Sequence, residues 1–450
     1  MNRKNYIKTG VFFIIFFILF YFGQKIVTAP EHRNYQWVRG FYAEEENSLD
    51  AVYLGSSNCY SFWNPLVAWE EYGIAVWPYS TNSQPFIAAE YLMKEVRKTQ
   101  PDTTFIINTS TIFVEDNTFK VLHYLLDYMP FSMNKLALTN YLCDSYNIPQ
   151  EERREYYIPM IRYHSRWSEL EERDFSYYLN GYKGAADYND YLDFHKDISA
   201  DYLLPQDCTD LPQPEKDPVV YRALDSLLDY CTQEDVKVVF VAVPRAEKSA
   251  EDLLRIKELS DTIAGRGFDM LFLTDKTEEI GLDLTKDYYN ETHTNIHGSI
   301  KFTHYISEYL VEKFGFEDKR GQAEYASWDA GFEKYMDDVL AYCVPAHELD
   351  STARNYTLPV PQNFAAEADG GSIGLTWDKT EGAEGYAIYR RDGKDKPLEL
   401  LAHTETASFT DTTAVTCRDI TYGYTVAAFR TENGTKIYGD CFLPVYNLLA

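Results

Sequence analysis

Val236-Lys-Val-Val-Phe-Val-Ala-Val243 is the strongest strand signal in the chain. Its apolar residues are mostly β-branched or aromatic and run almost without interruption, which is typical of a strand buried on both faces. Helical patterns lie on either side of it, at 219–231 and 250–264. Buried strands that alternate with helices form parallel sheets covered by helices on both faces. This stretch therefore predicts an α/β domain.

The same alternation of strand and helix extends in both directions from this stretch. Each further strand is short and apolar, and the helices that separate them have the spacing of amphipathic segments. The predicted strands are 49–54, 74–78, 103–107, 236–243 and 270–273, and the predicted helices are 65–72, 85–98, 219–231, 250–264 and 299–314. The predicted fold is a doubly wound parallel sheet.

Residues 117–216 interrupt this alternation with a segment rich in Tyr, Trp and charged residues. A segment of this length does not serve as a plain connection within a compact domain. We expect a mixed helical and loop insertion that packs on the sheet as a cap and also acts as a lid over the substrate groove.

Two short stretches contain the residue types needed for nucleophilic catalysis. Leu54-Gly-Ser-Ser57 follows the first predicted strand, and Asp287-Tyr-Tyr-Asn290-Glu-Thr-His293-Thr-Asn295-Ile-His297-Gly298 precedes the last predicted helix. A serine hydroxyl needs an adjacent base, usually an imidazole. Because loops at one edge of a parallel sheet lie together, we expect Ser57 as nucleophile beside His293 as base. The alternatives are a helix-capping serine and a solvated histidine.

Together, these stretches resemble the SGNH (GDSL-like) hydrolase family, whose first block is Gly-Asp-Ser and whose last block is Asp-x-x-His. The form in this chain is similar to a Firmicute cell-surface branch related to proteins of teichoic-acid D-alanylation and alginate O-acetylation. The resemblance covers roughly 48–335 and includes Tyr72-Gly-Ile74, Gln84-Pro85, Asp127-Tyr-Met-Pro130, Arg162-Tyr-His-Ser-Arg-Trp167 and Lys301-Phe-Thr303. It implies a flavodoxin-like three-layer domain with esterase or acyltransferase activity and no cofactor.

The chain departs from this family at the third catalytic position, where Asn290 replaces the aspartate. A carboxylate orients the imidazole and stabilises the imidazolium, whereas an amide orients it without adding charge. Asp287 or Glu291 could substitute for the missing carboxylate, or a Ser–His dyad could suffice. The alternative function is therefore a catalytically degenerate surface protein with a role in adhesion or assembly.

The resemblance also implies where the oxyanion donors lie. In the family they come from the nucleophile's own backbone N–H and from the loops after the second and third strands. Asn108 follows the third predicted strand, and Ser80, or Ser83, follows the second. For Asn108 the alternative is a side chain that satisfies the backbone of a local turn.

Four further residues are candidates for substrate binding: Arg162, His164 and Trp167 in the insertion, and Arg245 after the strongest strand. A flat aromatic ring suits a sugar face, and a guanidinium fork suits a carboxylate or phosphate. The alternative for the insertion residues is a structural arginine–acid pair beside a buried tryptophan.

The N-terminus reads as an export signal. Arg3, Lys4 and Lys8 precede an apolar segment at 9–27, which is about 20 residues and long enough to span a bilayer. The basic residues place the N-terminus inside and the following domains outside. A signal peptide cleaved after Ala29 is the alternative, which Pro30 disfavours.

Charge and cysteine spacing exclude several classes of function. The formal net charge of −28 argues against nucleic acid, whose phosphates would be repelled. The seven cysteines include no Cys-x-x-Cys pair, so neither a zinc site nor a dense disulfide scaffold is expected. Cys417 and Cys441 are close enough in sequence for pairing to stay open. We expect no metal.

The last part of the chain has short alternating strands and resembles a fibronectin type III module. Its expected leading strand is 358–364, its core tryptophan is Trp377 and its tyrosine-corner residue is Tyr422. The expected divisions are an anchor at 1–29, the hydrolase-like domain at 30–345, a linker at 346–356 and this module at 357–450.

These patterns together predict an extracellular, membrane-anchored serine acyl esterase or O-acyltransferase that acts on cell-envelope polysaccharide or a related polymer. The resemblance implies a membrane-bound O-acyltransferase as the partner.

Overall fold

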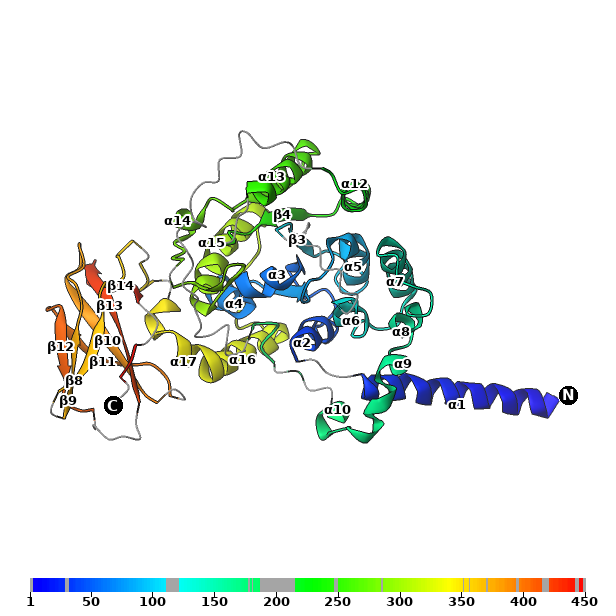
Figure 1. Ribbon diagram of the computed structural model, residues 1–450, viewed down its shortest axis with the longest axis horizontal. Helices are drawn as coiled ribbons and strands as arrows, with labels where there is room; N and C mark the ends of the chain where they lie inside the picture. The colour runs from blue at the N-terminus through cyan, green and yellow to red at the C-terminus, as the bar shows by residue number, and fades with distance from the viewer. Residues whose placement is uncertain are drawn as a thin grey trace.

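The computed structural model contains a helix-covered sheet, an apolar N-terminal helix that projects from it, and C-terminal antiparallel strands (Figure 1). The residues that it describes are 3–28, 32–110, 121–176, 179, 181–186, 215–246, 250–284, 286–350, 352–355, 357–369, 371–393, 396–414, 421–441 and 445–447. Cys208, Cys417, the expected cleavage site at 29–30 and parts of the insertion at 117–216 lie outside these residues.

Five parallel strands form the central sheet in the order β2-β1-β3-β4-β5. The strands are β1 (Ala51–Gly55), β2 (Val76–Ser80), β3 (Thr104–Asn108), β4 (Val238–Ala242) and β5 (Asp269–Phe272). All lie within about two residues of their expected bounds, which is the usual uncertainty of an element's ends. The order is that of flavodoxin-like sheets, which bind ligands at the carboxyl edge beside the strand where the order reverses. Here that point lies between β1 and β3.

Helices cover both faces of this sheet (Figure 1). They are α3 (Ser57–Phe62), α4 (Pro65–Tyr72), α5 (Ala89–Val96), α12 (Pro218–Gln233), α13 (Ala250–Gly265) and α15 (Ile296–Phe314). Along β1, Val52 and Leu54 join the core shared with α5, α12 and α13, whereas Ala51 and Tyr53 join the core shared with α3 and α15. Successive side chains of a strand point to opposite faces, so β1 is buried on both. The expected α/β fold is confirmed.

The insertion is helical in its described part, as expected. Its elements are α6 (Val121–Leu126), α7 (Met133–Ser145), α8 (Arg153–Tyr157), α9 (Pro159–Tyr163), the 3₁₀-helix η2 (His164–Ser168) and α10 (Glu172–Ser176). Leu122, Leu126, Leu138 and Leu142 of α6 and α7 join the main core, so this part is a cap that packs on the domain. Its action as a lid stays a prediction.

Helix α1 (Arg3–Val27) is the apolar N-terminal segment. Within Asn5–Val27, the most apolar window of 18 residues has a mean hydropathy of 2.1. Only 6% of that window is buried. The helix is long and apolar enough to cross a membrane or to serve as a signal sequence, and the two alternatives stay open.

The C-terminal strands form two antiparallel sheets that face each other across a core containing Trp377. One sheet has the order β11-β10-β13-β14 and the other β12-β9-β8. The strands are β8 (Ala365–Asp369), β9 (Ser372–Thr376), β10 (Gly385–Asp392), β11 (Glu399–Thr404), β12 (Ser408–Asp411), β13 (Tyr422–Glu432) and β14 (Thr435–Cys441). A short β15 (Val445–Asn447) pairs with β13.

The expected leading strand at 358–364 is wrong, because the first strand of these sheets is β8. Pro359 and Pro361 explain the difference, since a proline has no N–H to donate to a neighbouring strand. Leu358 is nonetheless buried and anchors the segment. Cys441 is a free, buried thiol.

The segment expected to be a linker, 346–356, is packed rather than extended into solvent. It begins with the 3₁₀-helix η6 (Ala346–Glu348), in which His347 and Glu348 are both buried. His347 Nδ1 lies 2.7 Å from the Tyr389 hydroxyl, and Arg354 bridges to Tyr438 of β14. Arg354 also pairs with Glu71 of α4 at 2.6 Å, so this segment joins the C-terminal sheets to the α/β domain through specific contacts.

Candidate active site

The sharp turn between β1 and α3 brings Ser57 to the carboxyl edge of the sheet. The backbone of this turn passes so close to neighbouring side chains that position 55 must be glycine. A Cβ there would lie 2.6 Å from Cys59 Sγ and 2.7 Å from Asn108 Cβ. The chain leaves β1 at Gly55 and α3 starts at Ser57. Ser57 thus lies at the point between β1 and β3 where sheets of this order bind ligands.

His293 comes to the same place from the hairpin before α15. The hairpin consists of β6 (Tyr288–Asn290) and β7 (His293–Thr294). His293 Nε2 lies 2.7 Å from Ser57 Oγ. Asn58 Nδ2 donates to the Thr292 carbonyl at 2.6 Å and so holds this loop against α3. The structure therefore brings the two residues expected to be nucleophile and base within hydrogen-bonding distance.

Asn290 orients the imidazole. Its Oδ1 lies 2.9 Å from His293 Nδ1 and accepts the backbone N–H groups of Thr292 and His293 at 3.0 and 3.1 Å. The Thr292 hydroxyl also lies 2.7 Å from His293 Nδ1, and it donates its proton to Asn290 Oδ1 at 3.1 Å. Because both oxygens can then only accept from the ring, we assign the proton of His293 to Nδ1. Nε2 then carries the lone pair that faces the Ser57 hydroxyl, which is the tautomer that a general base needs.

The surroundings of His293 keep its imidazole neutral. Burial lowers the pKa of His293 to about 4, and the positive charge of Arg245 acts in the same direction. Arg245 Nη1 donates to the Ser110 carbonyl at 3.3 Å, which holds the guanidinium near the site. Of the residues expected to bind substrate, Arg245 is the one whose charge the structure brings to the Ser–His pair.

Asp287 does not replace the missing carboxylate. Its Oδ2 accepts from Lys301 Nζ at 2.7 Å and from the backbone N–H of Asp283 at 2.7 Å, and its Oδ1 has no hydrogen-bond partner among the described residues. Neither oxygen bonds His293. The groups that hydrogen-bond His293 Nδ1 include the amide oxygen of Asn290 and the hydroxyl of Thr292.

The two expected oxyanion donors have different surroundings. The Asn108 side chain accepts from the Ser110 N–H at 2.8 Å and donates to the Tyr53 hydroxyl at 3.3 Å, so its contacts are those of the local-turn alternative. Ser80 lies beside Gly55 in the pairing of β1 with β2. Its hydroxyl is fully buried and has no hydrogen-bond partner in the described part of the chain.

Arg162, His164 and Trp167 lie away from this centre. Figure 1 shows α9 at the base of α1 and α3 in the middle of the domain. Trp167 is 52% exposed, which is not the buried tryptophan of the structural alternative. His164 is also exposed and bonds the Ile161 carbonyl at 2.8 Å. The three residues lie together, as expected, but beside the N-terminal helix rather than beside the Ser57–His293 pair.

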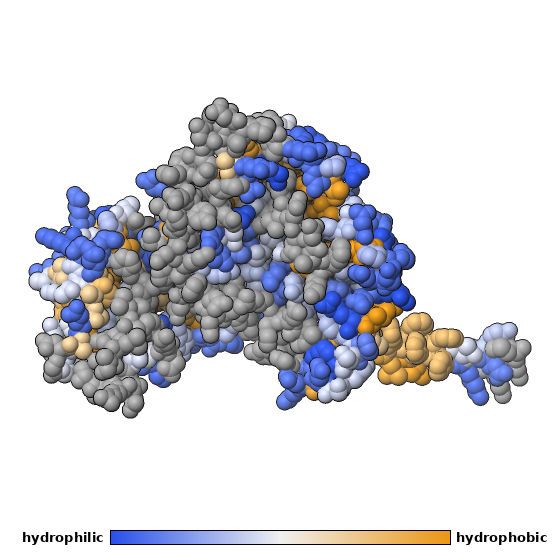
Figure 2. Space-filling view, viewed as in Figure 1, coloured by the Kyte–Doolittle hydropathy of each residue, from blue (hydrophilic) through white to orange (hydrophobic). Residues whose placement is uncertain are grey.

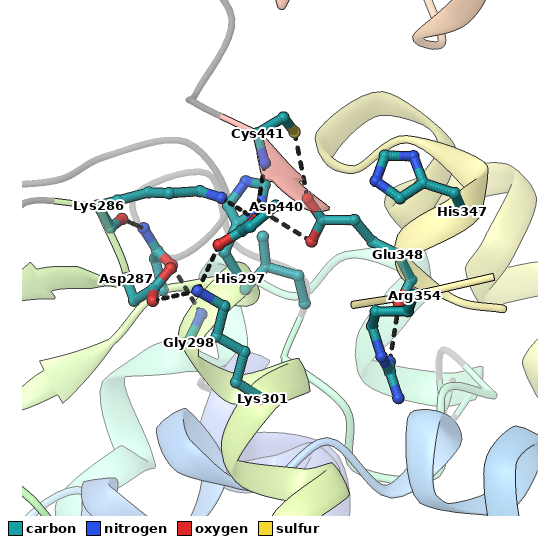
Figure 3. Close-up of polar contacts among 12 residues, drawn as sticks. Lys286, Asp287, His297, Gly298, Lys301, His347, Glu348, Arg354, Asp440 and Cys441 are labelled. Carbon is teal, nitrogen blue, oxygen red and sulfur yellow. Dashed lines mark hydrogen bonds and ion pairs between the residues drawn. The ribbon is translucent and has the colours of Figure 1, made fainter. Parts of the chain in front are cut away.

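A cluster of buried charges lies beside the β6–β7 hairpin, where the C-terminal sheets meet the α/β domain (Figure 3). Lys286 and Lys301 both pair with Asp440 of β14, and Lys301 also pairs with Asp287. All four side chains are buried. Lys286 and Asp287 directly precede β6, so the C-terminal sheets contact the base of the hairpin that carries Asn290 and His293.

This cluster is an ion-pair network rather than a metal centre. Glu348, Asp440 and Cys441 bring ligand-type atoms within 4.8 Å of one another. Both oxygens of Asp440 already pair with lysines, and the Cys441 thiol donates to Glu348 at 3.1 Å. The lysines supply the positive charge that a cation would otherwise bring.

Sequence reasoning missed the residues that hold the β6–β7 hairpin. Asn58 follows Ser57 and Thr292 precedes His293, so their proximity to the two candidate residues was a usable signal. The pairing of Asp440 with Lys286 had no such signal, because the two residues are far apart in the sequence.

No protein-family model and no curated protein matches the chain. Similar solved structures include a Fn3-like protein from Clostridium thermocellum, at 24% identity over 19% of this chain and 90% of that one, with a TM-score of 0.16. A fibronectin type III domain of human collagen XX is 23% identical over 20% of this chain and 93% of that one, with a TM-score of 0.16. Pectate lyase PelI from Erwinia chrysanthemi is 17% identical over 20% of this chain and 29% of that one, with a TM-score of 0.17. The C-terminal strands resemble fibronectin type III domains in their two facing antiparallel sheets. The matches carry no argument about chemistry.

Proposed function

We propose that the chain is an exported serine acyl esterase or O-acyltransferase of the SGNH type that acts on cell-envelope polysaccharide or a related polymer. The observation that carries the proposal is the relay from Ser57 Oγ through His293, at 2.7 Å, to Asn290 Oδ1, at 2.9 Å. An exposed serine–histidine pair of no functional importance would not need an acceptor on the far side of the ring. The polysaccharide substrate rests on the family resemblance.

The geometry supports a two-step acyl transfer. Ser57 Oγ would attack the acyl carbonyl carbon while its proton passes to His293 Nε2. When the carbonyl re-forms, the bond to the alcohol oxygen breaks, and His293 returns the proton to that leaving oxygen. Water or a sugar hydroxyl then attacks the acyl-enzyme and gives its proton to His293. The bond from the acyl carbon to Ser57 Oγ breaks, and His293 returns the proton to Oγ. Hydrolysis and transfer differ only in this second nucleophile.

Two groups would stabilise the oxyanion that forms in each step. The backbone N–H of Ser57 is in the first turn of α3, where N–H groups have no acceptor within the helix. The buried hydroxyl of Ser80, on the adjacent strand, is the second candidate donor. Donors that are held in place before the reaction contribute most to such catalysis.

Asn290 is the feature that favours the non-enzymatic alternative, in which the domain serves adhesion or assembly. An amide gives no charge to stabilise imidazolium, and burial already lowers the pKa of His293 to about 4. Both effects make protonation of His293 less favourable in the transition state, so we expect a slow enzyme.

A membrane-bound O-acyltransferase is the partner that the transfer reaction would need.

Labelling with a fluorophosphonate tests the proposal, because a base-activated hydroxyl attacks phosphorus rapidly at neutral pH. We expect wild type to be labelled, and Ser57→Ala and His293→Ala to lose the label. Ser61→Ala is the matched serine control, since its hydroxyl lies in α3 but bonds the Asn58 carbonyl. His164→Ala is the histidine control, because that ring is exposed and bonds the Ile161 carbonyl.

Label that survives Ser57→Ala would place the nucleophile elsewhere. A folded wild-type protein that takes up no label and hydrolyses no acyl ester would favour the adhesion or assembly role.

A further inference from the structure

Helix α1 has two parts that differ in their surroundings. From Tyr6 to Phe22 its large apolar side chains are mostly exposed. From Gly23 onward the helix is covered, and Val27 is fully buried. The bare part is roughly 26 Å long at about 1.5 Å per residue, close to the hydrocarbon thickness of about 30 Å. If α1 spans a membrane, the covered part therefore begins where the bilayer ends.

The insertion covers this last part of α1. Helices α9 and α10 and the 3₁₀-helix η2 all contact α1. A Cβ on Gly23 would lie 3.3 Å from Met160 Cε and 3.8 Å from Trp167 Cη2, which shows how closely the elements pack. Arg166 Nη1 donates to the Val27 carbonyl at 2.8 Å, and Nη2 pairs with Asp174 at 2.8 Å. These contacts tie the insertion to the end of α1.

The same part of the insertion exposes large apolar side chains. Ile161 is 41% exposed, Trp167 52% and Phe175 59%, and they belong to the elements that contact α1. Figure 2 shows apolar surface on the domain where the apolar stretch of α1 meets it. Contiguous exposed apolar surface on a domain marks an interaction site.

We infer that the α9–η2–α10 surface, defined by Ile161, Trp167 and Phe175, rests on the outer leaflet of the membrane that α1 crosses. The inference depends on α1 acting as an anchor rather than as a cleaved signal. A bilayer is favoured over a protein partner because α1 leaves the hydrocarbon region beside these side chains. Tryptophan and isoleucine at that level lie where aromatic and apolar groups enter the interface.

The charges of this surface indicate how it binds. Three arginines and four acidic residues lie on the same short segment: Arg162, Arg166, Arg173, Glu169, Glu171, Glu172 and Asp174. Acidic groups offset the attraction of the arginines to anionic lipid, so apolar contact supplies the binding. We therefore expect contact that is insensitive to salt. Such contact would hold the Ser57 site in one orientation relative to the membrane.

A fluorophore placed on this surface in the full chain tests the inference. The background carries Cys208→Ser and Cys417→Ser, because the other five cysteines are buried and shielded from the label. Ile161→Cys and Phe175→Cys, labelled with an environment-sensitive probe, report on the surface. Leu400→Cys is the matched control, since Leu400 is 50% exposed on β11 of the C-terminal sheets.

In phosphatidylcholine–phosphatidylglycerol vesicles, we expect the probes at 161 and 175 to shift to the blue. Lipids that carry a shallow quencher should reduce their emission, iodide in the water should not, and high salt should change neither result. Iodide should quench the probe at 400, and the lipid quencher should leave its emission unchanged.

Iodide quenching at 161 and 175 as strong as at 400 would overturn the inference. Probes shielded from iodide but not quenched by lipid would mean that a protein, a second copy or another partner, covers this surface. A chain that fails to float with the vesicles would remove the anchor and overturn the inference as well. None of these outcomes depends on labelling of Ser57, so the proposed chemistry is tested separately.

Discussion

Asp440→Ala is expected to destabilise the whole molecule, because Asp440 is the partner of two buried lysines. Lys286 and Lys301 come from the α/β domain and Asp440 from the C-terminal sheets, and all three are buried (Figure 3). Burial by itself would lower the pKa of Lys286, but attraction to Asp440 and Glu348 raises it above its usual value. Both lysines are therefore charged, and the substitution leaves Lys286 without its paired carboxylate.

The cost follows from the burial of these charges. Removal of one partner from a buried ion pair costs about 3–5 kcal/mol. At about 2.1 cal/mol/K per residue, one kcal/mol corresponds to roughly 1 °C in Tm for a chain of 450 residues, so Tm should fall by about 3–5 °C. Lys301 keeps Asp287 at 2.7 Å, which limits the loss to the lower part of this range.

Thermal unfolding followed by intrinsic fluorescence at pH 7 measures this effect. Asp378→Ala is the matched control, because Asp378 is an exposed aspartate in the loop after β9 and its loss should cost less than about 0.5 kcal/mol. The double variant Asp440→Ala with Lys286→Met should recover part of the lost Tm, since it removes the unpaired charge. Fluorophosphonate labelling of the folded Asp440→Ala protein should also be slower, because Lys286 supports the hairpin that carries His293.

A Tm for Asp440→Ala within about 1 °C of the Asp378→Ala control would refute the reasoning, because a buried charge that loses its partner costs several kcal/mol. Equal Tm values for the single and double variants would also refute it, since Lys286 would then not be the source of the cost.

Three further outcomes are expected. Asn290→Asp should raise aryl acetate hydrolysis by at least about tenfold, because a carboxylate in place of the amide stabilises the imidazolium of His293; an unchanged rate in an active protein would mean that the amide already suffices. Labelling of Ser57 should persist as the pH is lowered and be lost with a midpoint near the His293 pKa of about 4, because only the neutral imidazole is a base. Arg245→Met should raise this midpoint, because it removes the positive charge that lowers the pKa. A wild-type midpoint near pH 6.5 would contradict the argument that burial lowers the pKa. Protease added to intact cells should release the chain after α1, because Arg3, Lys4 and Lys8 favour an inside N-terminus; a chain protected until lysis would contradict export.

The sheet and its order of elements could be predicted because burial leaves a periodic trace in the sequence. The run at 236–243 became β4, and the spacing of the other apolar runs predicted β1, β2, β3 and β5. The prolines at 359 and 361 were a local signal against a strand. The expected leading strand at 358–364 followed the resemblance to a fibronectin module instead, and that expectation was wrong. The pairing of Ser57 with His293 could be predicted because both residues lie in loops at the carboxyl edge of the sheet, where such loops come together.

Other parts of the site had no local signal. Arg162 and Trp167 were grouped with the substrate pocket, and only the packing of the insertion placed them beside α1. Asn108 lies at the expected end of β3, yet the direction of its amide depends on Tyr53 and Ser110. Side-chain direction at a strand end is decided by neighbours from other strands, which a single sequence does not show.

The sequence by itself determined the helix-covered sheet, the apolar N-terminal helix and the two stretches that carry Ser57 and His293, because each depends on periodicity or on residue type over a short span. Only the tertiary structure decided that Asn290 orients His293, that Asp287 belongs to an ion-pair network and that Asp440 reaches Lys286 and Lys301. The physical reason is range: hydrogen bonds and ion pairs act over a few ångströms, and the residues that they join here are brought within that distance by the packing of the whole chain.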